Sequence, residues 1–429
     1  MATVHLPTEL WIAIFYYLRP SSLRAVHCVS SALRDVSSRF LFEDVHLELE
    51  TLQGAGLKQF SERMALLSSP GIAPYIRRVQ LSTGDNFGET PVSLDCRNKS
   101  IVVALRAIPF FVNLQSLRIY FLSKDNHADL SRLGLETLEN LDELAITGCS
   151  FHSRNNAAAK IRVNRLFLRF CNFTHHSKGF AGLRRSFLPA IDPQALRLLT
   201  LHFDSNIFAD WLEDDASPPT AFPNLRELRL TGSVSRKQLG KIFARFPSIR
   251  RFSIESLKDT ATPLAVELNA FTGPCTLLPL VLPQTGCSEL TLAVSDLYGG
   301  NGLAHYLAAA GRAPSVTSLN LTLSSARLGA WEAPYDAFSL IPNVAELRLI
   351  IWFEHVESYY RDTVTRETYP DILARVLRAP PRLQHVIIEG SETLPFMVSE
   401  CELEAALRRA VPNLIGIRFR SLVPEGRAL

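Results

Sequence analysis

A six-residue frame that recurs down the chain restricts its fold more than any other feature. Each frame carries apolar residues at its first, fourth and sixth positions, and successive frames begin 22 to 39 residues apart. The last four residues of a frame alternate in and out, as a short strand with one buried face does. Twelve frames fit: Ile76-Val79-Leu81, Leu114-Leu117-Ile119, Leu141-Leu144-Ile146, Val163-Leu166-Leu168, Leu196-Leu199-Leu201, Leu225-Leu228-Leu230, Ile249-Phe252-Ile254, Cys287-Leu290-Leu292, Val316-Leu319-Leu321, Val344-Leu347-Leu349, Leu383-Val386-Ile388 and Leu414-Ile417-Phe419.

Helical segments precede many of the frames, with apolar residues at helical spacing in 239–243, 372–377 and 403–407. A proline then stops the helix, because it lacks the amide hydrogen and clashes with the preceding turn. No single unit can bury its apolar face, whereas a stack of units can. The pattern predicts an α/β solenoid, a horseshoe with a curved parallel sheet and outer helices, over residues 49–429. Six frames have the proline two residues before the first apolar position: Pro223, Pro247, Pro314, Pro342, Pro381 and Pro412.

The frames resemble the LxxLxL core of leucine-rich repeats, although the asparagine that usually follows that core is mostly missing. A doubly wound α/β enzyme also alternates helices and strands, but its strands are usually long apolar runs because both faces are covered. The strands expected here alternate, and no glycine-rich phosphate loop follows the early ones, which favours the solenoid. Long connections are expected at 82–107, 170–190, 202–221, 256–286 and 351–370.

Residues 1–48 differ from the rest and predict three short helices. In the first helix, Leu10, Ile14 and Leu18 fall one turn apart, and Pro7 suits its opening. Arg19-Pro20 ends it, Ser21 or Ser22 can cap the second helix, and Ser30 or Ser31 can cap the third. A bundle this small has little core of its own, so it needs to dock on the first repeat or on a partner.

This segment resembles an F-box, followed by a leucine-rich-repeat domain as in similar, particularly fungal, proteins. The family often has tryptophan where this chain has Leu33, which keeps an apolar anchor with less bulk. The resemblance rests on Leu6-Pro7-x-Glu9-Leu10, Ile14-Phe15-x-x-Leu18, Leu23, Val26, Val29-Ser30, Leu33-Arg34 and Leu41-Phe42-Glu43-Asp44-Val45.

The resemblance implies the substrate-recognition subunit of an SCF (Skp-cullin-F-box) ubiquitin ligase. The partners would then be a Skp-type adaptor, a cullin held through it, and a target protein of unknown identity. A plain hydrophobic cap for the open end of the solenoid is the alternative for this segment. The residues implied to form or support the adaptor-binding face are Leu6, Pro7, Leu10, Ile14, Leu18, Leu23, Val26 and Leu33.

The outward residues of the strands are the candidates for binding a target on the concave face. Arginine together with exposed aromatic residues is typical of a recognition surface. A solvated sheet face of mixed charge is the alternative. Arg165, Phe167 and Arg169 form the densest group on one strand. The candidates are Arg118, Tyr120, Arg165, Phe167, Arg169, Arg229, Arg251 and Arg348.

Composition and motifs favour an intracellular binding protein. The net charge of +3 does not suit a general polyanion binder, so we expect no nucleic-acid partner. Seven dispersed cysteines without a CxxC pair are typical of reduced thiols. The chain shows no signal-peptide pattern and no apolar run of about 18 residues, so we expect a cytoplasmic or nuclear location and no membrane association.

We expect no catalytic residue, metal or cofactor. Cys171, His175 and His176 lack a second ligand pair at metal-binding spacing. Residues 299–302 are glycine-rich but lack the P-loop lysine and the dinucleotide fingerprint. Two alternatives to the receptor remain: a non-catalytic leucine-rich-repeat scaffold that is not engaged in ubiquitination, and an enzyme with an unrecognised site.

Overall fold

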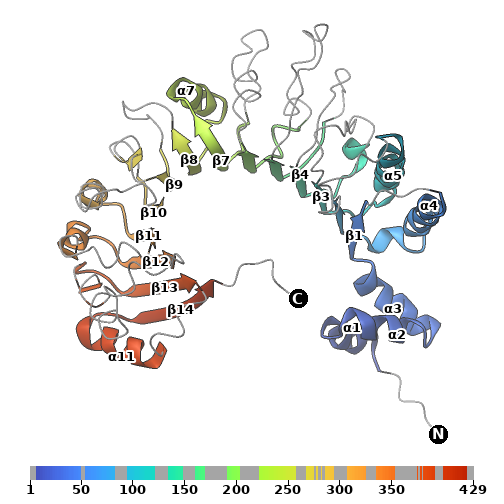
Figure 1. The fold of residues 1–429 in the computed structure, drawn as a ribbon, viewed down its shortest axis with the longest axis horizontal. Helices are drawn as coiled ribbons and strands as arrows, with labels where there is room; N and C mark the ends of the chain where they lie inside the picture. Colours follow the sequence, from blue (N-terminus) through green and yellow to red (C-terminus); the bar gives the residue numbers. More distant parts are fainter. Residues whose placement is uncertain are drawn as a thin grey trace. The chain divides into compact units, whose positions relative to one another are not determined.

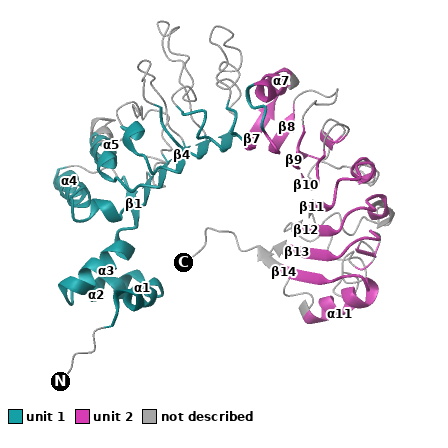
Figure 2. Ribbon diagram, turned by 180° about the vertical axis from the view of Figure 1, so that it is seen from behind, with its two compact units in different colours: residues 1–225, 245–248 teal, residues 226–244, 249–429 magenta. Residues whose placement is uncertain are grey.

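The computed structural model divides the chain into two compact units, which are described separately (Figure 2). The first unit comprises residues 1–225 and 245–248, and the second comprises 226–244 and 249–429. The described residues are 6–49, 54–82, 94–120, 134–147, 160–169, 191–202, 222–257, 267–274, 277–278, 282, 286–293, 307–324, 335–352, 374, 377–378, 380–391 and 400–422.

Three helices open the first unit, as predicted: α1 (Thr8–Tyr16), α2 (Pro20–His27) and α3 (Ser31–Leu41). Helix α3 packs against both others. The buried ring of Phe15 joins α1 to α3, because it meets Phe40 edge-on with ring centroids 6.2 Å apart. The apolar spacing of α1 thus supplies the core of the bundle as well as its exposed side.

The caps of these helices confirm one prediction and correct another. Ser30 caps α3, since its hydroxyl oxygen accepts a hydrogen bond from the Leu33 amide at 3.2 Å. Neither Ser21 nor Ser22 caps α2, because that helix begins at Pro20 with Arg19 in the N-cap position. Proline suits the first turn of a helix, where its missing amide hydrogen would have no intrahelical acceptor.

Parallel strands follow the helices in the first unit: β1 (Asp44–Glu48), β2 (Arg78–Ser82), β3 (Ser116–Tyr120), β4 (Glu143–Thr147), β5 (Arg165–Arg169) and β6 (Leu198–His202). Their order in the sheet is their order in the sequence. Helices α4 (Ala55–Leu67) and α5 (Leu94–Ala107) pack together on one face of this sheet (Figure 1). Short 3₁₀ helices η1 (Ala73–Tyr75), η2 (Ile108–Phe110) and η4 (Leu135–Thr137) lead into three of the strands.

The second unit repeats this plan with β7 (Glu227–Val234), β8 (Arg251–Leu257), β9 (Ala270–Pro274), β10 (Glu289–Ala293), β11 (Ser318–Ser324), β12 (Glu346–Trp352), β13 (His385–Ser391) and β14 (Gly416–Leu422). These strands also lie in sequence order. Helices α7 (Arg236–Arg245) and α11 (Glu400–Ala410) lie on one face of the sheet, and the 3₁₀ helix η9 (Tyr335–Leu340) precedes β12 (Figure 1). The sequence predicted both α-helices, and Pro247 and Pro412 follow their ends.

All twelve predicted frames form strands of this mixed α/β repeat fold, and nearly all their apolar positions are fully buried. The exceptions are Leu168, Ile417 and Phe419, which are half-buried. Of the predicted long connections, 170–190, 202–221 and 351–370 lie almost wholly outside the described residues, as does most of 372–377. The histidines and cysteine at 171–176 and the glycines at 299–302 also lie outside them.

The structure adds two strands that the sequence analysis missed. Strand β1 lies within the predicted domain 1–48, so the last residues of that segment form the first strand of the sheet. Strand β9 lies within the connection expected at 256–286. Its frame begins with Leu268 and Phe271, but the third apolar position is occupied by Gly273. A Cβ there would lie 2.8 Å from the Phe271 ring and 2.9 Å from the Ile254 carbonyl oxygen, so the site has no room for an apolar side chain.

A recurrent asparagine ties consecutive turns of the first unit together. Each such asparagine directly precedes the first apolar position of its frame, and its side-chain amide donates to a turn carbonyl of the preceding repeat. This bond satisfies a backbone acceptor that the turn leaves unpaired. The bonds are Asn113 to Pro74 at 2.7 Å, Asn140 to Val112 at 3.1 Å and Asn224 to Gln194 at 2.7 Å.

Candidate functional site

Helix α1 and the residue before its cap expose a row of apolar side chains. The exposed fractions are 40% for Leu6, 49% for Leu10 and 42% for Ile14. Leu10 and Ile14 are four residues apart in a helix and therefore share one face. Pro7 beside them is exposed as well. The bundle leaves these apolar groups in water, where a partner can cover them.

The other predicted adaptor residues are less accessible. Leu18, Val26 and Leu33 are half-buried, and Leu23 is only 5% exposed. Leu23 can therefore support the face from within the bundle but cannot contribute contact area. Three further exposed residues of the segment were not among the predicted adaptor-binding residues: Tyr16, Tyr17 and Val29, the last named from the sequence only as part of the F-box resemblance. The two tyrosine rings are adjacent, with centroids 5.4 Å apart. An aromatic pair at the end of an amphipathic helix is the sequence feature that could have identified them as candidate contact residues.

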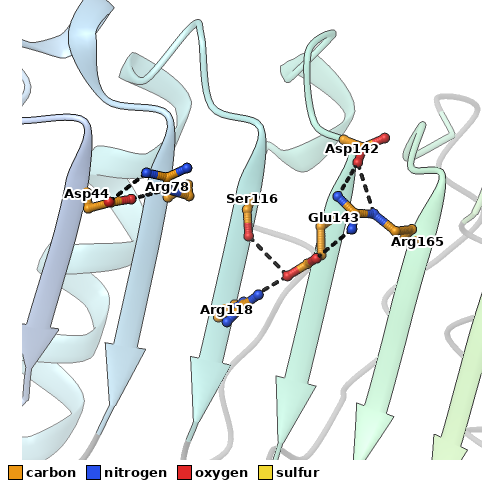
Figure 3. Close-up of polar contacts among 7 residues, drawn as sticks. All are labelled: Asp44, Arg78, Ser116, Arg118, Asp142, Glu143 and Arg165. Atoms are coloured by element: carbon orange, nitrogen blue, oxygen red, sulfur yellow. Dashed lines mark hydrogen bonds and ion pairs between the residues drawn. The ribbon is translucent and has the colours of Figure 1, made fainter. Parts of the chain in front are cut away.

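The outward face of the first-unit strands carries a chain of ion pairs (Figure 3). Glu143 on β4 is the centre: its Oε1 accepts from Arg118 Nε at 2.7 Å and from the Ser116 hydroxyl at 3.2 Å. On its other side, Oε2 lies 3.4 Å from Arg165 Nη1. The side chain of Glu143 is 7% exposed, so a buried carboxylate links two arginines from the neighbouring strands β3 and β5.

Asp142, directly before β4, holds Arg165 from a second direction. Its Oδ2 accepts from Arg165 Nε at 3.0 Å and from Nη2 at 2.5 Å, and its Oδ1 accepts from the Asn164 amide at 2.7 Å. Partial burial disfavours the charged carboxylate, but the bonds from Asn164 and Arg165 outweigh it and lower the pKa of Asp142. The bond to Glu143 raises the pKa of Arg118, with smaller contributions from Tyr120. Both groups are therefore charged at neutral pH.

The arginines predicted to face a target in the second unit are also paired. Arg229 Nη2 lies 2.5 Å from Glu227, Arg251 lies 3.6 Å from Glu289, and Arg348 donates to Glu389 at 2.6 Å. Of the remaining candidates, Arg169 is exposed and the rings of Tyr120 and Phe167 are half-buried. The structure thus brings Arg118, Tyr120, Arg165, Phe167 and Arg169 together on β3 and β5 of one unit, and places Arg229, Arg251 and Arg348 on the other.

Apart from Arg229 and Glu227, which are two positions apart on β7, most of the ion pairs went unnoticed in the sequence because they join residues from different strands or strand ends. Arg118 and Glu143, for example, are separated by 25 positions. The frames align neighbouring strands position by position, as in Leu117, Leu144 and Leu166, but the spacing does not show which outward side chains bond one another. Arg78 shows the same arrangement at the first strand pair, where it bonds Asp44 on β1 and lies 3.4 Å from Glu43.

The described residues show neither a metal centre nor a membrane span. Within the described ranges, no group of three or more histidine, cysteine, aspartate or glutamate side chains is arranged to hold a metal ion. No described helix combines the length and the hydropathy that crossing a bilayer requires.

The exposed apolar row and three-helix bundle define a small helical binding module joined to a repeat fold. Comparison with known proteins assigns the module: residues 3–48 match the F-box-like family. The chain therefore carries an F-box-like domain at its N-terminal end, and domains of this kind generally bind Skp-type adaptors. No curated protein matches the chain.

Proposed function

We propose that this protein is the substrate receptor of an SCF-type ubiquitin ligase. The F-box-like domain binds a Skp-type adaptor and, through it, a cullin, while the repeats, of the leucine-rich type, bind a target protein. The observation that carries the proposal is the exposed row Leu6, Leu10 and Ile14 within a segment that matches the F-box-like family. Within the described residues of the bundle, these three side chains remain 40–49% exposed.

The energetics of the row suit a stable interface. Fully burying an exposed aliphatic side chain contributes about 1.5–3 kcal/mol before the cost of association, and side chains that are 40–49% exposed would gain about half of that. Three such side chains, flanked by the exposed Tyr16 and Tyr17, supply enough apolar area for a lasting contact. Other apolar side chains hold the helices that carry these exposed residues in place; they are the half-buried Leu18, Val26 and Leu33.

In this proposal the chain itself performs no chemistry and needs no cofactor. It acts by proximity, because holding a target beside a charged ubiquitin-conjugating enzyme raises the effective concentration of the target's lysines. The place of action would be the cytoplasm or the nucleus. The outward strand faces, with Arg118 and Phe167 among their residues, are the surface that would select the target.

The decisive test is co-purification of the full chain with a Skp-type adaptor. Replacing Leu10 and Ile14 together by glutamate puts two charges where the adaptor would cover apolar groups. We expect a loss of adaptor affinity on the order of 100-fold. The matched control is Leu66→Glu in α4, because Leu66 is an aliphatic helix residue at least as exposed, at 58%, but lies outside the F-box-like domain.

Blotting the same complexes for cullin separates the receptor from the scaffold. Recovery of adaptor and cullin together supports the receptor, whereas adaptor without cullin supports a scaffold that takes no part in ubiquitination. Undiminished adaptor binding by the double variant would refute the assignment of the row, and an equal loss with Leu66→Glu would indicate nonspecific aggregation.

A further inference from the structure

Strand β14 ends the order of strands in the second unit (Figure 1). Among the described residues it pairs only with β13, in a parallel register that joins Gly416 to His385 and Leu422 to Ser391. A strand at the end of a sheet presents a row of backbone amide and carbonyl groups to whatever lies beside it. The free side of β14 can therefore receive a further strand.

The hydrogen bonds to β13 show which residues of β14 face that free side. The Gly416 amide donates to the Gln384 carbonyl oxygen at 3.1 Å, so the backbone of Gly416 points toward β13. Because backbone direction alternates along a strand, Arg418 also points toward β13, while Ile417 and Phe419 point away from it. Nothing in the described part of the chain bonds the backbone of these two residues on the free side.

The inward side chains of β14 are less covered than those of the strand before it. Val386 and Ile388 on β13 are 1% and 2% exposed, whereas their register partners Ile417 and Phe419 are half-buried. In a stack of repeats each strand is covered partly by the next one, and β14 has a neighbour on one side only among the described strands. Apolar side chains of an added strand would complete this cover.

An exposed isoleucine extends the apolar area at this end of the sheet. Ile415, directly before β14, is 65% exposed. The same frame position is occupied by Thr317, Ala345 and Gln384 in the three preceding frames. A large aliphatic side chain in water, continuous with other apolar side chains, at a position that is small or polar in the neighbouring repeats, is typical of a contact surface.

The outward side chains give the charge that an added strand would meet. Arg418 is exposed, and no described residue forms an ion pair with it. The carboxylate of Glu389 on β13 is 1% exposed and accepts from Arg348 at 2.6 Å. His385 lies against Gly416, since a Cβ on that glycine would come within 2.8 Å of the imidazole Nδ1. The exposed charge beside the free side is therefore that of Arg418.

This charge decides between two kinds of partner. A second copy of β14 would bring its own arginines, at 418 and 420, beside Arg418, and like charges across two strands destabilise their pairing. An acidic side chain at that position would form an ion pair instead. On the other face, Ile417 and Phe419 require apolar side chains, because side chains alternate between the two faces of a strand. We call the backbone of Ile417 and Phe419, together with the Arg418 side chain, the β14 edge.

We propose that the β14 edge binds an extended segment of a partner protein in which apolar residues alternate with acidic ones. The segment adds a strand to the sheet and bonds the backbone groups of Ile417 and Phe419. Its apolar side chains cover the inward side chains of these two residues, and an acidic side chain on the opposite face pairs with Arg418. The inference is independent of the proposed function, because it uses no residue of the F-box-like domain.

The test uses the purified full chain and a short fluorescein-labelled peptide in which valine alternates with glutamate. Two comparison peptides have the same length: one has its valines and glutamates in separate blocks, and the other has lysine in place of glutamate. Fluorescence anisotropy should show binding of the alternating peptide and at least about tenfold weaker binding of the block peptide. The lysine peptide should bind about threefold to tenfold more weakly than the glutamate peptide.

N-methylated peptides test whether the contact is a strand pairing. Along an added strand, alternate residues direct their amides toward β14, and the residues between them direct theirs to solvent. Methyl groups on the amides of all glutamates, or on those of all valines, should therefore have unequal effects. One set should abolish binding, and the other should leave the affinity within about threefold of the unmethylated peptide.

Charge reversal locates the contact at β14. Arg418→Glu should invert the preference, so that the lysine peptide binds more tightly than the glutamate peptide, and a misfolded chain could not produce this inversion. The matched control is Arg251→Glu in β8. Arg251 is also an exposed arginine on a strand of the second unit, but β8 has a paired strand on both sides. This variant should keep the original preference.

Several outcomes would overturn the inference. These are no binding of the alternating peptide, equal binding of the block peptide, loss of binding with both N-methylated sets or with neither, and an unchanged preference in Arg418→Glu. A dimer of the free chain in sedimentation velocity that the alternating peptide disperses would show that a second copy occupies the edge, and would overturn the choice of partner. Adaptor binding is measured separately, so its failure is distinct from failure at the β14 edge.

Discussion

Leu10 in helix α1 and Leu144 in strand β4 are the same residue type in opposite surroundings. The side chain of Leu10 is about half exposed, whereas that of Leu144 is fully buried. The difference follows from size. A bundle of about 40 residues has too little interior for all of its apolar side chains, while each repeat is covered by the next one.

The surfaces of the two regions differ in the opposite sense: the repeats expose charged side chains, and the helices expose apolar ones. In the repeats, arginine and glutamate on the outward face are paired across strands, as Arg118 and Glu143 are. In the exposed row of the F-box-like domain, the residues are aliphatic. The comparison teaches that the two regions offer different chemistry: the helices present apolar area, and the first-unit strands present charged side chains held in ion pairs.

The difference between the two regions is tested most directly by making the same substitution, leucine to alanine, in both. Leu144→Ala should lower the free energy of unfolding by about 2–5 kcal/mol, because it leaves a cavity in a fully packed stack. Leu10→Ala should change it by less than about 1 kcal/mol, because the side chain is already half in water. Urea unfolding followed by circular dichroism measures both.

Adaptor binding should respond in the opposite order. Leu10→Ala should weaken it, whereas Leu144→Ala should leave it unchanged under conditions where the first unit stays folded. If both variants lost similar stability, Leu10 would have to be part of the packed interior of the folded chain. In that case the row on α1 would cap the repeats, and the idea that it awaits a partner would fail.

Much of this contrast could be predicted from the sequence. The spacing of Ile76, Val79 and Leu81 and its eleven counterparts predicted strands with one buried face, and the buried positions agree. The stripe through Leu10 and Ile14 predicted the first helix. Regular periodicity is visible in a sequence because it depends on residues that are close together in the chain.

What could not be predicted depends on contacts between distant residues. Strand β9 has a glycine where the frame requires an apolar residue, because Ile254 and Phe271 fill that space. The bond of Asn140 to Val112 links residues 28 positions apart, and the pairing of Arg118 with Glu143 requires the strand register. Aligning the frames gives the strand register but does not show which polar side chains bond across it, so neither contact could be read from spacing.

The close packing of the repeats can be tested a second time at Gly273 in β9. Gly273→Ala should lower the stability of the second unit by about 1–3 kcal/mol, since the new Cβ would meet a backbone oxygen that cannot move independently. The matched control is Gly240→Ala in α7, where a Cβ meets nothing within 4 Å. That variant should gain about 0.4–1 kcal/mol, because alanine restricts the unfolded chain.

Urea midpoints of the two glycine variants should therefore move in opposite directions. Equal and small shifts would mean that β9 is packed no more tightly than the surface of a helix. The contrast between a loosely covered bundle and a closely packed stack of repeats would then not extend to this part of the second unit.

The smallest expected effect concerns the charged face of the repeats, and it depends on pH. The pKa of Asp142 is lowered in the folded chain, so the carboxylate stabilises the fold above the pKa it has when unfolded, about 3.9. That contribution is lost as the pH falls through the lower pKa of the folded state. Because the side chain is 38% exposed, solvent screening limits the contribution to about 0.2–1 kcal/mol.

Asp142→Asn keeps an oxygen that can accept from Asn164 and removes the charge that holds Arg165. The variant should be less stable than the unaltered chain at pH 7, and the difference should shrink as the pH falls from 5 to 3. Urea unfolding at several pH values measures it. A difference that stays constant with pH would show that Asp142 acts through its shape and neutral hydrogen bonds. The outward face of the repeats would then depend less on charge than its ion pairs indicate, and the contrast with the apolar helices would weaken accordingly.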